Sequence, residues 1–157
     1  MANHIVLYQP LIPANTGNIS RTCAGTRTTL HLIRPLGFST EDKALKRAGL
    51  DYWEHVDIVY HDHLDELFHA YPEGYFYYIT KFGSHTYTDR DYTVEGDHFF
   101  IFGQETKGLP DTLLQQNPER CLRIPMDDTH IRALNLSNTA ALVLYEALRQ
   151  QGWPHLT

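Results

Sequence analysis

The sequence predicts an α/β fold: a mostly parallel sheet with helices on both faces. Short apolar runs of strand length alternate along the chain with segments that have helical periodicity. The run Phe99–Phe102 is apolar throughout, which is typical of a strand buried on both faces. The chain has 157 residues, of which 42% are hydrophobic and 20% charged, so we expect a single domain over residues 1–157.

The first half of the chain alternates between strands and helices. Asn15 is expected to cap the first helix and Gly25 to end it, because these residue types favour such positions. Gly49 should end the second helix, and Asp62 should cap the third. In order, the expected elements are a strand Ile5–Tyr8, a helix over residues 16–24, a strand Leu30–Arg34, a short polar helix Glu41–Ala48, a strand Val56–Tyr60 and a helix His63–Ala70.

The second half continues the alternation around one polar, turn-rich stretch, Phe82–Asp97. The last helix is the longest, with apolar residues at helical spacing and Ser137 as its expected cap. In order, the expected elements are a strand Tyr75–Thr80, the strand Phe99–Phe102, a helix Leu109–Gln116, a strand Cys121–Ile124 and a helix Ser137–Gln150.

Composition limits the classes of partner. A formal net charge of −6 argues against non-specific coating of nucleic acid, and we expect no DNA partner. No apolar run approaches the ~20 residues that span a bilayer, and the start of the chain lacks the basic and apolar regions of a signal peptide. We therefore expect no membrane partner and a cytoplasmic location, with Cys23 and Cys121 as reduced thiols.

Neither of the common nucleotide-binding signatures is present, since the sequence contains no G-x-G-x-x-G after the first strand and no P-loop. His61, His63, Asp65 and Glu66 are close in sequence, but carboxylates are common at the start of a helix. We interpret this group as a solvated helix end and expect no metal.

Three segments each follow an expected strand and precede an expected helix: residues 15–21, 103–110 and 124–138. In an open α/β sheet, ligands bind beyond the carboxyl ends of the strands, which is where these segments should lie. Asn135, Ser137 and Asn138 place more polar groups at one helix start than capping requires. The alternative interpretation is that each segment is an ordinary connection.

Together the three segments resemble the motifs of the SPOUT superfamily of RNA methyltransferases. The matching patterns are N-x-G-x-x-x-R from Asn15, F-G-x-E-x-x-G-L-P from Phe102, and I-P-M followed by L-N-L-S-N. Order and spacing agree from Ile5 to Trp153. The stretches at Arg47–Tyr52 and Tyr145–Ala147 are similar to the minimal bacterial tRNA (cytidine/uridine) 2′-O-methyltransferases, which act on the wobble nucleotide of leucine tRNAs.

The resemblance implies a C-terminal trefoil knot and a bent S-adenosyl-L-methionine held by three loops. Knots are rare, so this expectation depends wholly on the family. An apolar slot with backbone polar groups suits adenine, although the same apolar residues could equally be core. The implied cofactor-binding residues are Tyr78, Ile79, Thr80, Gly103, Glu105, Ile124, Ala133 and Leu134.

The resemblance also implies catalytic roles for Arg21, Tyr145, Ser137 and Asn138 in a homodimer acting on tRNA. The pKa of an arginine side chain is too high for a simple neutral base, so Arg21 should fix the phosphate or hydroxyl. Tyr145 could instead be a core or dimer residue. The implied substrate-binding residues are Asn15, Arg21, Lys107, Arg132 and Asn135.

Two departures from the closest group concern Gln104 with Lys107, where Pro and Arg are more usual, and His130–Ala133, which replaces a serine-rich stretch. Contacts at Ala133 would then involve only its backbone. Two other functions remain open: methylation of ribosomal RNA by the same fold, or a non-catalytic dimeric RNA-binding module.

Overall fold

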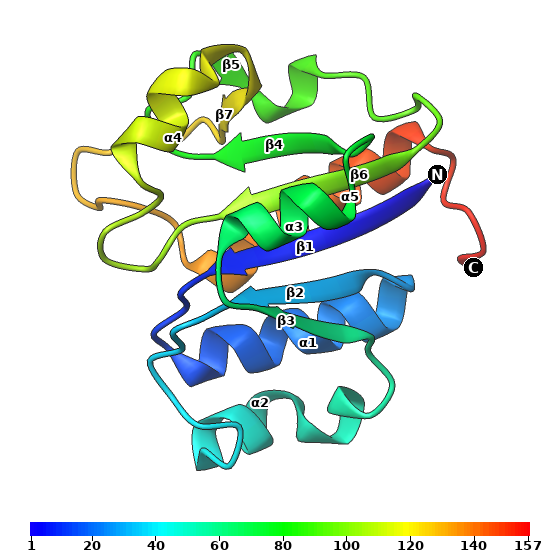
Figure 1. The fold of residues 1–157 in the computed structure, drawn as a ribbon, viewed down its shortest axis with the longest axis vertical. Helices are drawn as coiled ribbons and strands as arrows, with labels where there is room; N and C mark the ends of the chain where they lie inside the picture. Colours follow the sequence, from blue (N-terminus) through cyan, green and yellow to red (C-terminus); the bar gives the residue numbers. More distant parts are fainter.

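Seven parallel strands form one sheet in the order β3-β2-β1-β6-β4-β7-β5 (Figure 1). The structure is a computed structural model that describes residues 1–157, except for the side chains of residues 49–52. The strands are β1 Ala2–Tyr8, β2 Thr29–Ile33, β3 Ile58–His61, β4 Tyr75–Ile79, β5 His85–Thr86, β6 Asp97–Phe102 and β7 Cys121–Arg123.

Helices cover both faces of the sheet. Helices α1 (Pro13–Thr26) and α5 (Leu136–Gln150) pack on one face, and α2 (Lys43–Trp53) packs against α1. Helices α3 (Leu64–Ala70) and α4 (Asp111–Gln116) cover the other face. Apolar residues of β6 alternate between the two cores: Phe100 and Phe102 face α1 and α5, whereas Phe99 and Ile101 face α3 and α4. The α/β architecture expected from the sequence is confirmed.

The stretch Phe82–Asp97, expected to be only polar turns, also contains β5 and a short 3-10 helix, Tyr87–Asp89. β5 is two residues long and pairs only with β7, through His85 with Leu122 and Thr86 with Arg123. A strand this short has no periodic signal, because its identity depends on the partner strand.

The predicted limits of the first helix are wrong at both ends. α1 begins at Pro13, whose fixed φ suits a first helical position, with Ile12 as the N-cap. Asn15 therefore lies inside the helix and does not cap it. Gly25 also lies inside, and the turn that ends the helix is made at Arg27, which has φ 55°.

The expected caps of three other helices also differ. α2 extends past Gly49 to Trp53, and at its start the Ala44 N–H donates to Asp42 Oδ1 at 2.8 Å. Asp62 does not cap α3, because its carboxylate accepts from Arg34 at 3.1 Å. Asn135 caps α5 in place of Ser137. The stretch Arg47–Tyr52, which carries part of the family resemblance, includes residues 49–52, whose side chains lie outside the described part of the structure.

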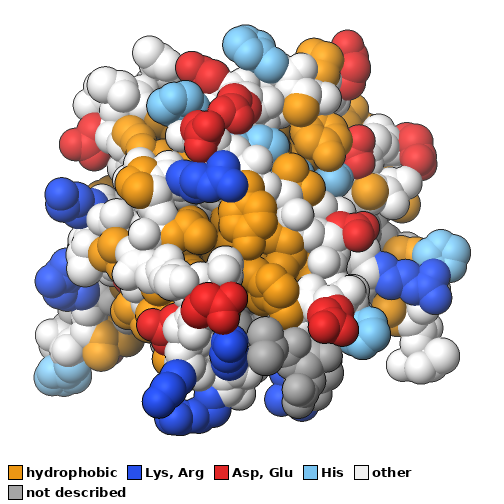
Figure 2. Space-filling view, turned by 60° about the horizontal axis from the view of Figure 1, so that its bottom comes forward, with side chains coloured by type: hydrophobic (Ala, Val, Ile, Leu, Met, Phe, Trp, Pro, Cys, Tyr) orange, Lys and Arg blue, Asp and Glu red, His pale blue; other side chains and the backbone are white. Residues whose placement is uncertain are grey.

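β3 forms one edge of the sheet, and its apolar side chains are only half-buried. Figure 2, which brings this side and α2 forward, shows hydrophobic side chains gathered near the centre with charged side chains around them. The Arg34 guanidinium lies over the Tyr60 ring, 4.9 Å from its centroid. A cation over the aromatic ring covers part of this exposed edge.

The connection from β4 to β5 crosses directly over β7. A Cβ atom at Gly83 would lie 2.5 Å from the Leu122 carbonyl carbon and 2.8 Å from the Arg123 nitrogen. Because both contacts are with backbone, neither can rotate away. Glycine at residue 83 therefore lets two segments about 40 residues apart lie in contact.

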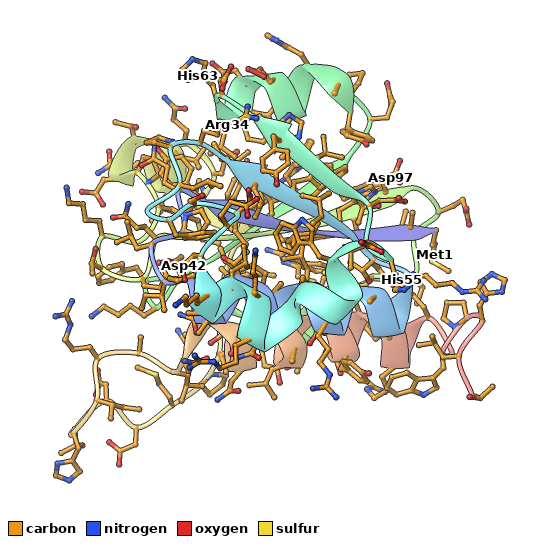
Figure 3. All side chains as sticks on the ribbon, turned by 90° about the horizontal axis from the view of Figure 1, so that it is seen from below. Met1, Arg34, Asp42, His55, His63 and Asp97 are labelled. Atoms are coloured by element: carbon orange, nitrogen blue, oxygen red, sulfur yellow. The ribbon has the colours of Figure 1, made fainter. Side chains whose placement is uncertain are left out.

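A line of hydrogen bonds joins three buried histidines and Asp97 across four neighbouring strands. His61 bonds to His31, His31 to His4, and His4 to the Asp97 carboxylate, each at 3.0 Å. Figure 3 shows Asp97 near Met1, at the end of the sheet where β1 and β6 begin, with Arg34 toward the other end. Since a carboxylate only accepts, each imidazole donates through Nε2 towards Asp97, and His4 and His31 accept at Nδ1. This line holds the register of β3, β2, β1 and β6.

Candidate functional site

A hydrogen-bonded junction joins the three motif segments at the carboxyl edge of the sheet. Glu105 follows β6, Asn15 follows β1 at the start of α1, and Asn135 follows β7 at the start of α5. Asn15 donates to Glu105 Oε2 at 3.2 Å and accepts from Asn135 Nδ2 at 3.1 Å. Residues up to 120 positions apart thus form one continuous chain of side-chain contacts.

Glu105 is the acceptor at one end of this junction. The Leu11 N–H donates to its Oε1 at 2.8 Å, and the Ile12 N–H donates to its Oε2 at 2.9 Å. These amides belong to the loop before α1, so the carboxylate receives three donors, one of them from Asn15. Hydrogen bonds to an ionised group are among the stronger ones, and here they fix the first segment against the second.

Asn135 performs two tasks at the other end of the junction. Its Nδ2 donates to Asn15, while its Oδ1 accepts from the Ser137 N–H at 2.9 Å and the Asn138 N–H at 3.4 Å. The side chain therefore caps α5 and holds that helix start beside α1.

The turn that carries Glu105 is closed by its own backbone. Gln104 and Gly108 exchange hydrogen bonds of 3.2 and 2.9 Å. A Cβ atom at Gly103 would lie 2.4 Å from the Gly108 carbonyl carbon, and Gly108 has φ +68°. Both glycines are required by the shape of the turn itself, whether or not a ligand approaches Gly103.

The structure places the expected cofactor residues on two segments beside this turn. Tyr78 and Ile79 are buried in β4, where burial raises the pKa of Tyr78 to about 12, and the Thr80 N–H donates to the Leu122 carbonyl at 2.9 Å. In the segment after β7, Ile124 and Leu134 are half-buried and Ala133 is exposed. Ile124 thus keeps an accessible apolar surface while packing against the core.

The expected catalytic residues lie on α1 and α5, which pack side by side on one face. Arg21 is exposed on α1, less than two turns beyond Asn15, and Asn138 is exposed in the first turn of α5. Ser137 donates through its hydroxyl to Asn135. Tyr145 lies two turns further along α5, is 45% exposed, and packs beside Trp153 with the ring centroids 5.7 Å apart.

The expected substrate residues fall into two groups. Lys107 and Arg132 are exposed on the second and third segments. By contrast, Asn15 is only 5% exposed and uses its amide as both donor and acceptor within the junction. The sequence pattern identified this junction's side chains but not the backbone amides of Leu11 and Ile12, which have no side-chain signal.

Among the described residues, no group of three or more histidine, cysteine or acidic side chains is arranged to hold a metal ion. Cys23 and Cys121 are both buried and free. No helix in the described part of the chain has the length and hydropathy of a membrane span.

A family model for the SpoU rRNA methylases matches residues 2–145, nearly the whole chain. The chain belongs to the SpoU methylase family. A Listeria monocytogenes member, provisionally named a tRNA (cytidine(34)-2′-O)-methyltransferase, is 71% identical over 154 residues, covering 98% of this chain and 90% of the relative.

Two solved structures of SpoU methylase relatives agree in fold. A Bacillus anthracis protein, provisionally described as an RNA methyltransferase, is 59% identical, covers 99% of this chain and 98% of its own, and superposes with a TM-score of 0.92. The second structure was solved to explain the 2-OH methylation of C/U34 on tRNA, and its chain is 40% identical to this one. The match covers 96% of this chain and 97% of that chain, with a TM-score of 0.87.

Proposed function

We propose that this SpoU methylase transfers a methyl group from S-adenosyl-L-methionine to the ribose 2′-hydroxyl of the wobble nucleotide, a cytidine or modified uridine, in leucine tRNAs. The junction of Glu105, Asn15 and Asn135 carries the proposal, because it brings all three motif segments to one place on the sheet. The relative named for cytidine 34 and the structure described for C/U34 support the same nucleotide.

The residues around the junction suit the cofactor. Adenine needs an apolar slot with backbone donors and acceptors. On the segment after β7, Ile124 and Leu134 are half-buried apolar side chains and Ala133 is exposed. Thr80, Gly103 and Glu105 lie on neighbouring strand ends and complete the set of expected contacts. When bound, S-adenosyl-L-methionine supplies the methyl group as an electrophile.

The chain's own residues must align the ribose and stabilise charge. Alignment counts most in a displacement reaction, because the attacking oxygen has to lie in line with the methyl group. The planar guanidinium of Arg21 presents several N–H donors, so it holds a phosphate or the ribose hydroxyl and stabilises negative charge on the oxygen. Asn138, exposed at the start of α5, would orient the ribose.

We further propose that the enzyme is a homodimer in the cytoplasm, where tRNA is modified. Arg21 on α1 would then face the cofactor of the partner subunit, and Tyr145 on α5 would lie at or near the contact. The crossing of residue 83 over β7 supports a trefoil knot formed by the chain from β7 onward.

Two measurements test the function. Isothermal titration calorimetry should detect S-adenosyl-L-methionine binding to the purified protein, and a deletion strain should lose wobble ribose methylation in its leucine tRNAs. Mass spectrometry of both RNA classes from that strain separates the tRNA function from ribosomal RNA methylation, which the family description also allows. Full wobble methylation in the deletion strain would contradict the proposal, and so would a protein that binds no cofactor.

Replacing Arg21 by alanine should abolish methyl transfer and leave cofactor affinity within about tenfold, because Arg21 acts on the substrate. Arg21→Lys keeps the charge but loses the planar fork, so it should retain a small part of the activity. Single-turnover assays with tRNA measure both variants. Wild-type rates in Arg21→Ala would remove this residue from the mechanism.

A further inference from the structure

An aromatic side chain stands out from the connection between β4 and β5. Phe82 is 76% exposed, the most of any large hydrophobic side chain among the described residues. Large apolar side chains are usually buried, so a phenylalanine with this exposure is a candidate contact for a binding partner.

The connection holds Phe82 in place. The Phe82 N–H donates to Thr80 Oγ1 at 3.2 Å, and the Gly83 N–H donates to the Thr80 carbonyl at 3.0 Å. Gly83 itself rests on the β7 backbone. The ring is therefore carried by a tight turn anchored to two strands, which reduces the entropy lost when a ligand binds.

One cation lies over the ring, and a second bonds to the turn that carries it. The Lys81 ammonium lies 5.2 Å from the Phe82 ring centroid, and Arg123 donates from Nη1 to the Gly83 carbonyl at 3.2 Å. Both side chains are exposed, in a protein whose overall charge is −6. An exposed aromatic ring beside cations is the combination that binds single-stranded nucleic acid, in which the base stacks and the phosphate pairs.

A cavity of about 300 Å³ opens beside the ring, between the connection and α4. Leu114 and Pro118 give it apolar walls, and Ser84, Asp111 and Gln115 add polar groups. This volume is at the lower end for ligand sites, enough for one base. The Asp111 carboxylate would repel a phosphate but can accept from a base amino group.

Phe82 follows directly on the end of β4, where the cofactor is expected. Thr80, two residues before Phe82, is an expected cofactor contact, and its N–H bonds to β7 just before the third motif segment. A nucleotide held at Phe82 would therefore be a close neighbour of the one that is methylated, and such neighbours are unpaired in an anticodon loop.

We propose that Phe82, with Lys81 and Arg123, forms a stacking platform for a nucleobase next to the methylated nucleotide in single-stranded RNA. This inference depends on the proposed function, since it takes the substrate to be an anticodon loop. The platform adds a substrate contact outside the three motif segments.

The experiment measures binding of a fluorescent anticodon stem-loop by anisotropy, with cofactor affinity and thermal stability as parallel readings. Phe82→Ala should weaken RNA binding about 5- to 100-fold, the loss expected for one stacked base, while cofactor affinity is unchanged. Phe82→Trp should keep wild-type affinity. Val94→Ala is the matched control, because Val94 is 43% exposed elsewhere and its truncation should not affect RNA binding.

Stem-loops with a single abasic nucleotide on either side of position 34 identify the partner base. The wild-type protein should bind one of the two abasic stem-loops more weakly than the intact stem-loop. Phe82→Ala should bind that abasic stem-loop and the intact stem-loop equally. Lys81→Ala should reduce the slope of log affinity against log salt by about 0.7, the value for one phosphate contact on a single strand.

If the wild type methylates tRNA but Phe82→Ala binds every stem-loop with wild-type affinity, the proposed stacking platform is wrong, whereas the proposed methyltransferase function is unaffected. If the wild-type protein neither binds nor methylates any RNA, the proposed function has failed instead.

Discussion

At the scale of single residues, the Glu105 side chain joins the turn after β6 to the loop and helix that follow β1. Its two carboxylate oxygens accept from two backbone amides and one side-chain amide, which come from the loop and helix that follow β1. A carboxylate is the only side chain of this size that accepts at both ends without offering a donor.

Replacing Glu105 by glutamine should lower the free energy of unfolding by about 1–3 kcal/mol. One oxygen becomes an NH₂ group that faces an N–H donor, which leaves a backbone amide without its acceptor. Urea denaturation measures the loss. Glu41→Gln provides the control, since Glu41 is exposed and pairs only with Lys46 in the described structure, so its loss should be within about 0.5 kcal/mol. Equal effects would show that the Glu105 contacts contribute no more than a surface pair.

At the scale of elements, the crossing of the β4–β5 connection over β7 depends on Gly83. An alanine there places its Cβ 2.5 to 2.9 Å from three backbone atoms of residues 121–123. We expect Gly83→Ala to destabilise the protein by more than about 2 kcal/mol, because neither segment can move without breaking strand pairing.

Ser84→Ala is the comparison for Gly83→Ala. It lies one residue further along the connection and loses only an exposed hydrogen bond to the Pro118 carbonyl, at a cost below about 1 kcal/mol. Thermal and urea unfolding of both variants decide the matter. A Gly83→Ala protein as stable as Ser84→Ala would mean that the two segments can separate cheaply.

The line of histidines makes a prediction about pH. Burial, followed by the nearby His4 and His61, lowers the pKa of His31 to about 3 from 6.5. The unfolded chain therefore binds a proton at this residue between pH 6.5 and 3 that the folded chain does not. Stability should fall as pH falls through that window, by up to about 1.4 kcal/mol per pH unit for this group. The groups that face the line are Asp97 and His98 beside His4, and Glu66 and Arg34 beside His61.

Urea denaturation from pH 7 to pH 4 measures this slope. His31→Leu removes the titrating group and should give a shallower decline than the wild type. Val6→Ala is the control, because Val6 is buried in the strand pair beside His31 and its truncation lowers stability equally at every pH. Identical slopes in wild type and His31→Leu would exclude His31 as a source of acid sensitivity.

The sequence predicted helices and strands well where the signal came from neighbouring residues. Phe99–Phe102 is apolar throughout and forms a buried strand, and the apolar spacing of the last helix is that of α5. Caps were predicted less well, since Asn15 and Asp62 are typical capping residues but bond to partners 90 and 28 residues away. Local preference cannot reveal such partners, because tertiary contacts decide which hydrogen bond a polar side chain makes.

The candidate site was likewise predictable only where its signal was local. Its three segments could be identified because each has its own sequence motif, and the family resemblance indicated that they form one site. The role of Glu105 in fixing Leu11 and Ile12 could not be predicted, since the two segments are over 90 residues apart and the donors are backbone amides. Phe82 lay in a stretch without periodicity, so only the folded structure showed its exposure.

At the scale of the whole molecule, one side of the α1 and α5 layer stays open. On α5 the exposed residues Asn138, Leu142, Tyr145 and Arg149 recur at intervals of three and four, which places them on one face of the helix. Arg21 is exposed on neighbouring α1. A face that mixes apolar and polar side chains beside Arg21, the arginine proposed above to act on the substrate, suits the proposed homodimer contact, in which a second copy of the chain covers it.

Introducing a charge at Leu142 should therefore separate the subunits. Leu142→Asp would bury an unpaired carboxylate in both halves of a symmetric contact, which is costly enough to favour monomers at micromolar concentration. Size-exclusion chromatography with light scattering reads the mass directly, and methyl transfer should fall with it, because Arg21 would lose the partner's site. Val94→Asp tests a charge at equal exposure, 43%, away from this face, and should leave the dimer and its activity intact. A Leu142→Asp protein with the mass of two chains would place the subunit contact elsewhere on the molecule.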